Sequence, residues 1–301
     1  MKFGKVEHPE NVNFAFPADH PDTEIVLSKQ KNEEPLQVYI GCAKWNRQDL
    51  KNFYPRGTKD ELTYYASQFN CIELNATFYR IFPGEQFATW YDKTPPEFRF
   101  FPKISQDISH LRRLNENVYP ILDTYLEAVS NLKEKLGTIF LQMHNNFGPK
   151  NWDRVVSFVK YWPKEFNLAM EFRHTDWFND PNVAQELYYL LEENDIANIL
   201  VDTAGRRDIM HMRLTNNEAF IRYVGANHAS DYDRLNDWEK RLKKWKDQGL
   251  KNIHFFVHQN LEVESPLLSA YFIKKINKTL GVNLKIPATL HKSGDLFDMK
   301  A

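Results

Sequence analysis

Two strand-like stretches of this chain each carry a carboxylate on the face opposite their most apolar side chains. The first, "CIELNATFYR" (residues 71–80), contains Glu73, and the second, "NLAMEFRHTDW" (residues 167–177), contains Glu171. Successive side chains of a strand point to opposite faces, so apolar residues two positions apart share one face and the carboxylates belong to the other. We expect the apolar faces to pack on helices and the carboxylates to point into a shared pocket.

Other strand-like stretches also end in polar residues, and we expect all of these groups to converge. The expected set is Glu73, Asn75, Lys103, Gln142, Glu171, Arg173, Asp202 and Arg222. Three acids would then face three bases, which would leave the inner site close to neutral. The alternative is a buried ion network that closes the mouth of the fold, because buried ions are costly unless they are paired.

Acid–base catalysis is the chemistry that these residue types favour. The predicted catalytic residues are Glu73, Lys103, Glu171 and Asp202. Burial and charged neighbours shift carboxylate pKa values, so Glu171 is predicted to transfer a proton while facing Glu73 across the pocket. Lys103 and Arg222 are predicted to hold an anionic group of the substrate.

A divalent cation is a second interpretation of the same carboxylates. Glu73, Glu171 and Asp202 offer oxygen ligands of the kind that Mg²⁺ or Mn²⁺ prefers. The histidines near these stretches lack zinc-site spacing, and the neighbouring cationic side chains would compete with a metal. A required metal is therefore disfavoured, and the sequence identifies no other cofactor.

Aromatic and polar residues in the strand-to-helix loops complete the predicted pocket. Trp45, Tyr79 and Trp177 lie where function concentrates in such folds, and they could stack on a sugar or a base or simply cover the barrel. The predicted substrate-binding residues are Trp45, Asn75, Tyr79, Gln142, Arg173, His174, Trp177, Arg222 and Gln259.

The elements that must position these residues alternate regularly along the chain. Strands are predicted at 37–45, 71–77, 98–105, 137–143, 167–173, 197–203, 218–225 and 252–258. Helices are predicted at 59–69, 84–93, 120–135, 151–162, 182–194, 234–248 and 265–280. Eight strands alternating with helices predict an α/β fold, a single TIM-like (β/α)8 barrel over residues 38–280. Residues 1–37 are predicted to be an irregular N-terminal extension, and residues 281–301 a C-terminal tail.

Composition narrows the class of protein. The chain has 301 residues, of which 42% are hydrophobic and 26% charged, and its net charge is −1. This is typical of a globular domain and lacks the basic excess of a non-specific nucleic-acid binder. Cys42 and Cys71 lie in apolar stretches, as reduced buried thiols do. With no signal peptide and no apolar run of membrane-spanning length, we expect a cytoplasmic protein without a membrane partner.

Several long motifs of the chain resemble those of the YecE-like family, domain of unknown function 72. They include "ELTYYASQFNCIELNATFYR" (61–80), "SHLRRL" (109–114), "LGTIFLQM" (136–143) and "EFRHTDW" (171–177). The resemblance implies a TIM-like barrel with a pocket lined by these residues and implies no reaction. The chain departs from the family pattern near the pocket rim, with Lys44 in place of a glycine and with His258 and Gln259 in place of paired asparagines.

Three classes of function remain compatible with these residues. The first is an enzyme acting by acid–base chemistry on a small anionic or sugar-like molecule, and the second a barrel that binds a metabolite without turning it over. The third is a nucleic-acid-binding or endonuclease-type barrel, in which His110, Arg112 and Arg113 would contact phosphates. The net charge of −1 counts against this third class.

Overall fold

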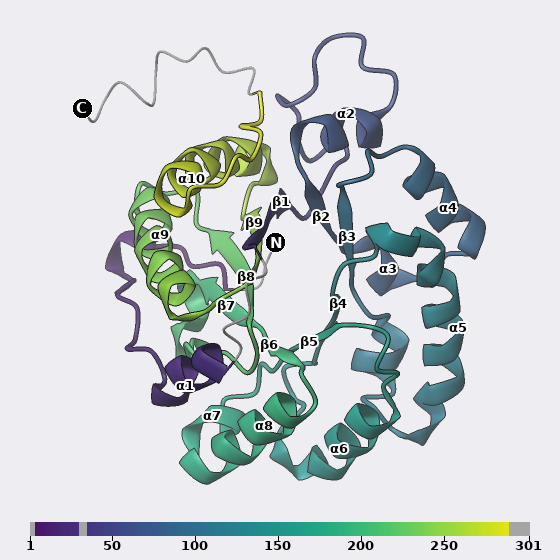
Figure 1. Ribbon diagram of the computed structural model, residues 1–301, viewed down its shortest axis with the longest axis vertical. Helices are drawn as coiled ribbons and strands as arrows, with labels where there is room; N and C mark the ends of the chain where they lie inside the picture. Colours follow the sequence, from purple (N-terminus) through teal and green to yellow (C-terminus); the bar gives the residue numbers. More distant parts are fainter. Residues whose placement is uncertain (1–3, 30–34, 289–301) are drawn as a thin grey trace.

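Parallel strands occupy the middle of the molecule and helices surround them, as Figure 1 shows for the computed structural model of the chain. The structure describes residues 4–29 and 35–288. Its strands are β1 (Gln37–Cys42), β2 (Cys71–Leu74), β3 (Arg99–Pro102), β4 (Ile139–Gln142), β5 (Leu168–Glu171), β6 (Ala197–Asn198), β7 (Leu200–Thr203), β8 (Glu218–Gly225) and β9 (Asn252–Gln259). Every hydrogen-bonded pair of these strands is parallel, so their carboxyl ends lie on one side.

The strands form three sheets. Their orders are β1-β9-β8-β7, β2-β3 and β4-β5-β6. Isolated parallel bridges link the β3 and β4 segments of the chain, one from Phe100 of β3 to Leu136 and one from Lys103 to Phe140 of β4. The sequence predicted one strand over 197–203 and a single closed barrel, whereas the described strands do not form one continuous hydrogen-bonded ring. The predicted sixth strand is divided into β6 and β7, which belong to different sheets.

Each predicted helical segment contains a helix. The bounds of the helices are α1 (Pro21–Lys29), α2 (Glu61–Gln68), α3 (Ala76–Tyr79), α4 (Gly84–Asp92), α5 (Tyr119–Val129), α6 (Trp152–Tyr161), α7 (Asp176–Asn179), α8 (Pro181–Glu193), α9 (Ser230–Gln248) and α10 (Ser265–Leu280). The structure adds α1, α3 and α7, which the sequence did not predict. Local signals set several ends: the Asp60 side chain caps α2 by accepting from the Thr63 amide, and Asp180 caps α8 immediately before Pro181. Gly249 ends α9 at φ +124°, where a side chain would also collide with the Leu27 carbonyl.

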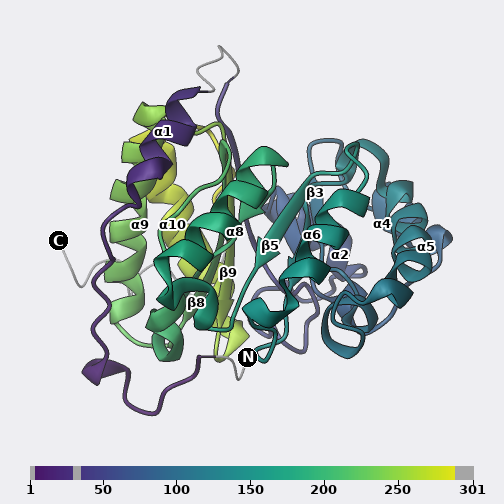
Figure 2. The same cartoon turned by 90° about the horizontal axis from the view of Figure 1, so that it is seen from below.

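The N-terminal segment is more ordered than the sequence predicted. It contains the helix α1, whose Thr23, Val26 and Leu27 are buried. The segment runs along α9 in both ribbon views (Figures 1 and 2), and Asp19 forms ion pairs with two basic residues of that helix. The rest of the predicted extension, residues 1–3 and 30–34, lies outside the described residues. Of the predicted tail, residues 281–288 are described and contain no helix or strand.

Two apolar clusters form the core. A large cluster joins the outward strand faces to the helices, and it includes Ile72, Leu74, Met170 and Phe172, as the alternation predicts. A smaller cluster is built from strand residues of the opposite face, including Cys71, Phe101, Phe140, Ala169, Phe220 and Phe256. The strand β1 approaches β2 so closely that a Cβ on Gly41 would lie 2.3 Å from the Cys71 carbonyl oxygen. Within the described part of the chain, no helix has both the length and the apolarity needed to cross a bilayer.

Candidate functional site

Glu73 is the last residue but one of β2 and Glu171 is the last residue of β5, and both carboxylates are fully buried. A single guanidinium lies between them. Arg222 of β8 donates to Glu73 Oε2 at 3.0 Å and Oε1 at 2.8 Å, and to Glu171 Oε2 at 2.6 Å. The two carboxylates therefore meet in one place, as the sequence predicted. They face each other through a cation rather than across open space.

Further partners complete the hydrogen bonding of Glu73. Asn75 Nδ2 donates to Glu73 Oε1 at 2.8 Å, and His258 Nε2 lies 2.9 Å from Oε2. Burial alone would raise the pKa of Glu73, but Arg222 and His258 outweigh it and hold the pKa well below its ordinary value. Glu73 is consequently a fixed negative charge at neutral pH.

Glu171 is held in the same way by a second arginine. Arg173 Nε donates to Glu171 Oε1, opposite the oxygen that Arg222 contacts. Burial would raise the pKa of Glu171, yet Arg173 and Arg222 lower it to about 2. A carboxylate with this pKa remains ionised throughout the neutral range, which argues against the predicted role of Glu171 in proton transfer.

Gln142 is the point at which the cationic side chains meet. Its Oε1 accepts from Arg173 Nη2 at 2.6 Å, Arg222 Nη1 at 2.9 Å and Lys103 Nζ at 3.1 Å. An amide oxygen supplies partial negative charge but no full charge. The neighbouring carboxylates already serve the two arginines, so the positive charge of Lys103 is not neutralised by direct pairing.

Lys103 follows β3 and is only 7% exposed. Among the described residues, no carboxylate lies within ion-pair distance of its Nζ, which is 4.2 Å from the centre of the Phe78 ring. Burial, followed by repulsion from Arg222 and Arg173, lowers the pKa of Lys103 to about 7. Lys103 can therefore gain or lose a proton near neutrality, which neither carboxylate can.

A cavity of about 1010 Å³ opens above this ion network. Of the predicted site residues, it is lined by Trp45, Glu73, Asn75, Tyr79, Lys103, His110, Gln142 and Arg173. Glu171 and Arg222 lie beneath this surface as partners of the lining residues. Tyr79, at 71% exposure, stands at the rim, whereas Trp45 packs edge-on against Trp90.

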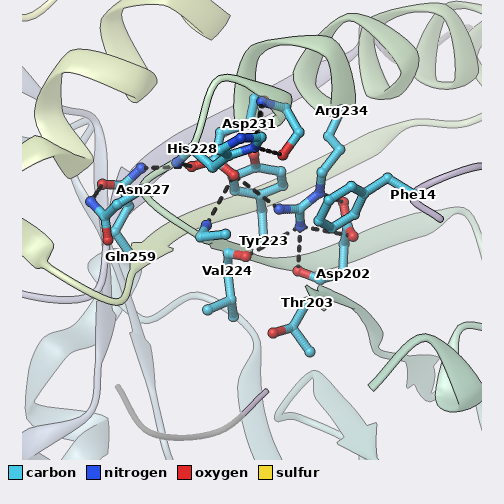
Figure 3. A network of polar contacts seen from close by, with 12 residues as sticks. Phe14, Asp202, Thr203, Tyr223, Val224, Asn227, His228, Asp231, Arg234 and Gln259 are labelled. Atoms are coloured by element: carbon cyan, nitrogen blue, oxygen red, sulfur yellow. Dashed lines mark hydrogen bonds and ion pairs between the residues drawn. The ribbon is translucent and has the colours of Figure 1, made fainter. Parts of the chain in front are cut away.

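Asp202 does not join this site, although the sequence predicted that it would. Arg234 Nη2 of helix α9 lies 2.8 Å from its Oδ1 (Figure 3). Trp238 Nε1 of the same helix donates to its Oδ2 at 2.8 Å. The neighbouring Val201 belongs to the inner apolar cluster, so alternation turns Asp202 toward the helices. Without Asp202, the site holds two carboxylates and three cationic side chains. Its charges therefore do not balance, whereas the sequence predicted a nearly neutral site.

The metal-ligand set Glu73, Glu171 and Asp202 is consequently not assembled. Arginine side chains take the carboxylate oxygens of the first two, and the third lies in another network. Within residues 4–29 and 35–288 there is no group of three or more His, Cys, Asp or Glu side chains placed to hold a metal ion.

Two other predicted substrate-binding residues are buried and hydrogen-bonded within the protein, and neither lines the cavity. Trp177 is fully buried, and its Nε1 donates to the Phe147 carbonyl at 2.6 Å. Gln259 is buried and hydrogen-bonded to Asn227 and Asp231 in the network of Figure 3. Trp177 lies in the short helix α7 after β5, and Gln259 is the last residue of β9, where strand alternation turns its side chain away from the cavity.

Of the remaining predicted residues, His174, Arg112 and Arg113 do not line the cavity. His174 is half-buried and lies 3.6 Å from Asp176, outside the lining of the cavity. Of the predicted phosphate-binding residues, only His110 lines the cavity, and burial lowers its pKa to about 4, so it is neutral at pH 7. Arg112 pairs with Asp107, and Arg113 donates to the His110 carbonyl.

Among the lining residues that were not predicted as site residues, His258 and Phe78 lie next to the ion network. His258 was noted only as a departure from the family pattern near the pocket rim, yet it is fully buried, contacts Glu73 and lines the cavity. Its alternation with His254 and Phe256 on the inner face of β9 is a signal that could have placed it there. Phe78, which precedes the predicted residue Tyr79, also lines the cavity, and its ring lies directly beside Lys103 Nζ.

Comparisons with known proteins place the chain in context. A family model described as "Protein of unknown function DUF72" matches residues 39–290. The UPF0759 protein YecE of Escherichia coli strain K12 is 26% identical over 278 residues, covering 85% of this chain and 98% of that protein. The UPF0759 protein YunF of Bacillus subtilis strain 168 is 23% identical over 242 residues, covering 70% of this chain and 85% of its own length.

Solved structures support the fold. The crystal structure of a DUF72 family protein from Enterococcus faecalis V583 matches with a TM-score of 0.65 and 20% identity, over 83% of this chain and 100% of that one. A DUF72 family protein from Thermotoga maritima MSB8 matches with a TM-score of 0.64 and 22% identity, over 80% and 99% of the two chains.

Proposed function

The chain belongs to the DUF72 family, and we propose that its strand-end cavity binds a small anionic substrate with Lys103 as the group that exchanges a proton with it. The observation that carries this proposal is the charge balance at the cavity floor. Lys103, Arg173 and Arg222 all donate hydrogen bonds to Gln142 Oε1. The two nearby carboxylates form ion pairs with the two arginines and not with the lysine. A bound anion would supply the missing negative charge.

Lys103 suits the proton-transfer role better than either carboxylate. An acid–base group works best when its pKa lies near the operating pH, and the pKa of Lys103 is lowered to about 7. Glu73 and Glu171 then act as fixed charges that position Arg222 and Arg173. This assignment replaces carboxylate acid–base chemistry with lysine acid–base chemistry in the same pocket.

The order of the strands supports a finer proposal for the fold. Taken in sequence, β2 to β9 and then β1 follow the cyclic order of a TIM-like (β/α)8 barrel, with parallel pairing wherever strands pair. In such barrels the active site lies at the carboxyl ends of the strands. The proposed site has this position, since Glu73, Gln142 and Glu171 lie late in their strands.

Fewer observations support nucleic acid than a small anion as the ligand of this cavity. Arg112 and Arg113 already have protein partners, and His110 is neutral at pH 7. Aromatic residues at the rim would suit a sugar ring or another flat group attached to a small anion.

Sulfate binding measured by calorimetry at about pH 6 tests the proposal, because Lys103 is mostly protonated there. We expect Lys103→Met to weaken binding by roughly tenfold or more, since a buried charge-assisted contact contributes about 1.5–3 kcal/mol. Lys44→Met is the matched control, because Lys44 also lines the cavity but is paired with Asp49 and half-exposed. Equal affinity in wild type and Lys103→Met, or no sulfate binding to wild type, would contradict the proposal.

A further inference from the structure

We propose that Lys103 forms an imine with the carbonyl carbon of a 2-oxo acid bound in the strand-end cavity. The inference rests on the proposed function, because it requires the same cavity to accept a small anion. It adds a covalent step and a substrate class, namely a carboxylate bonded directly to an aldehyde or ketone carbon.

The amine of Lys103 is available for this step, as a comparison with another buried lysine shows. Lys135 Nζ donates to the carbonyls of Tyr91 and Thr94, each at 2.6 Å, and to Thr94 Oγ1 at 3.3 Å. Lys103 Nζ has one hydrogen-bond acceptor among the described residues, Gln142 Oε1 at 3.1 Å, and it lines the cavity. Lys135 is saturated by the protein, whereas Lys103 keeps bonding capacity on its cavity side.

A cationic side chain that could attract the carboxylate of the substrate lies beside the same amine. Arg173 also lines the cavity, and its Nη2 shares the Gln142 oxygen with Lys103. In a 2-oxo acid the carboxylate and the reactive carbonyl carbon are directly bonded. One small molecule can therefore place its negative charge near Arg173 and its carbonyl carbon at Lys103.

The surroundings of Lys103 also favour a nucleophilic amine. Phe78 covers one side of Nζ, and only 7% of the residue is exposed, which limits access of bulk water. The lowered pKa, about 7, means that a large fraction of the amine is uncharged near neutrality. Glu73 and Glu171 do not trap it as an ammonium, because their oxygens are engaged by Arg222, Arg173, Asn75 and His258.

The step balances without any oxidant or reductant. The neutral Nζ attacks the carbonyl carbon, an N–C bond forms, and one Nζ proton passes to the carbonyl oxygen to give a carbinolamine. The C–O bond then breaks, and the oxygen leaves as water together with the second Nζ proton. The product is a neutral imine, and hydrolysis reverses the sequence.

Reductive trapping tests this inference on the full-length protein. Glyoxylate is the probe, sodium cyanoborohydride reduces any imine to a secondary amine, and peptide mass spectrometry locates the added carboxymethyl group. We expect saturable modification of Lys103 that acetate, a carboxylate without the carbonyl, inhibits. Lys44→Met should keep this adduct, Lys103→Arg should lose it, and Lys135 should remain unmodified throughout.

The outcomes separate this inference from the proposed function. If glyoxylate and sulfate bind to wild type but Lys103 acquires no adduct, the imine is refuted and the anion site stands. If neither anion binds, the proposed function fails as well. Modification of exposed lysines at the same rate as Lys103, without saturation, would also overturn the imine, and this readout does not depend on any variant folding.

Discussion

At the scale of single residues, the site separates charges that are fixed from one that is not. Arg222 pairs with both Glu73 and Glu171, and Arg173 pairs with Glu171, so both carboxylates remain ionised at any ordinary pH. Lys103 shares the amide oxygen of Gln142 with these arginines but has no carboxylate partner among the described residues. The reactive group of the site is therefore expected to be the lysine and not the acids that first attract attention in the sequence.

Replacing Glu171 by glutamine should destabilise the fold. The change leaves Arg173 and Arg222 buried with one carboxylate fewer, and breaking a buried ion pair on one side costs about 3–5 kcal/mol. Urea unfolding of Glu171→Gln measures this cost. Asp247→Asn is the control, because its pair with Lys243 is exposed and should contribute about 0.5 kcal/mol or less. A Glu171→Gln protein as stable as wild type would show that the network is not a stabilising one.

The same network predicts a loss of stability in acid. The folded-state pKa of Glu171, about 2, lies below the ordinary value of 4.5, so its contribution is fully present above pH 4.5 and is lost as the pH falls toward 2. Glu73, whose pKa is also lowered, should add to this loss. Urea unfolding at a series of pH values should show the free energy of unfolding dropping across this window. A free energy that is flat across this window would contradict the paired-carboxylate description.

At the scale of elements, strand alternation predicted the inner face where one face of a strand is clearly apolar. Glu73 and Glu171 were placed correctly because Ile72, Leu74 and Met170 mark the other face. Asp202 was placed wrongly because "ILVDT" is apolar on both faces, and its partners Arg234 and Trp238 come from a helix distant in sequence. Such a partnership depends on tertiary packing that local pattern does not encode.

The loops after the strands were predicted less well than the strands. Trp177, which follows β5, was expected at the pocket by its sequence position alone, and its side chain turns into the protein. Gln259 was expected there too, but it is the last residue of β9 and its side chain bonds to Asp231 instead. The direction of a loop side chain depends on the loop's own hydrogen bonds, as with the bond from Trp177 to the Phe147 carbonyl. His258, by contrast, follows from the alternation of β9 and could have been found.

Asp202→Asn should weaken the protein without affecting the cavity. Asp202 of β7 pairs with Arg234 of α9 and with Arg207. Because the substitution removes this charge, we expect the free energy of unfolding to fall by about 3–5 kcal/mol. Sulfate affinity of the folded protein should stay within about twofold of wild type, since Asp202 does not line the cavity. A folded Asp202→Asn protein that no longer binds sulfate would show that Asp202 does contribute to the site.

At the scale of the whole molecule, the alternation of strands and helices was sufficient to predict a parallel α/β fold. The solved DUF72 structures support that architecture with TM-scores of 0.65 and 0.64. The division into three hydrogen-bonded sheets was not predictable, because it depends on how closely neighbouring strands approach. The helix α1 was missed although Pro21 at its start and two acidic residues in its first turn favour a helix, because only Thr23, Val26 and Leu27 along it are buried and its apolar stripe is short.

The whole fold thus directs one uncompensated cation into a large cavity, and the pH dependence of sulfate affinity tests this claim most directly. Sulfate keeps a constant charge between about pH 6 and pH 9, so any change reflects the protein. Because Lys103 has a pKa of about 7, affinity should be highest below pH 7 and should fall by up to about tenfold per pH unit above it. In Lys103→Arg, whose side chain remains protonated, the profile should be nearly flat. A wild-type affinity that is constant from about pH 6 to pH 9 would contradict the account.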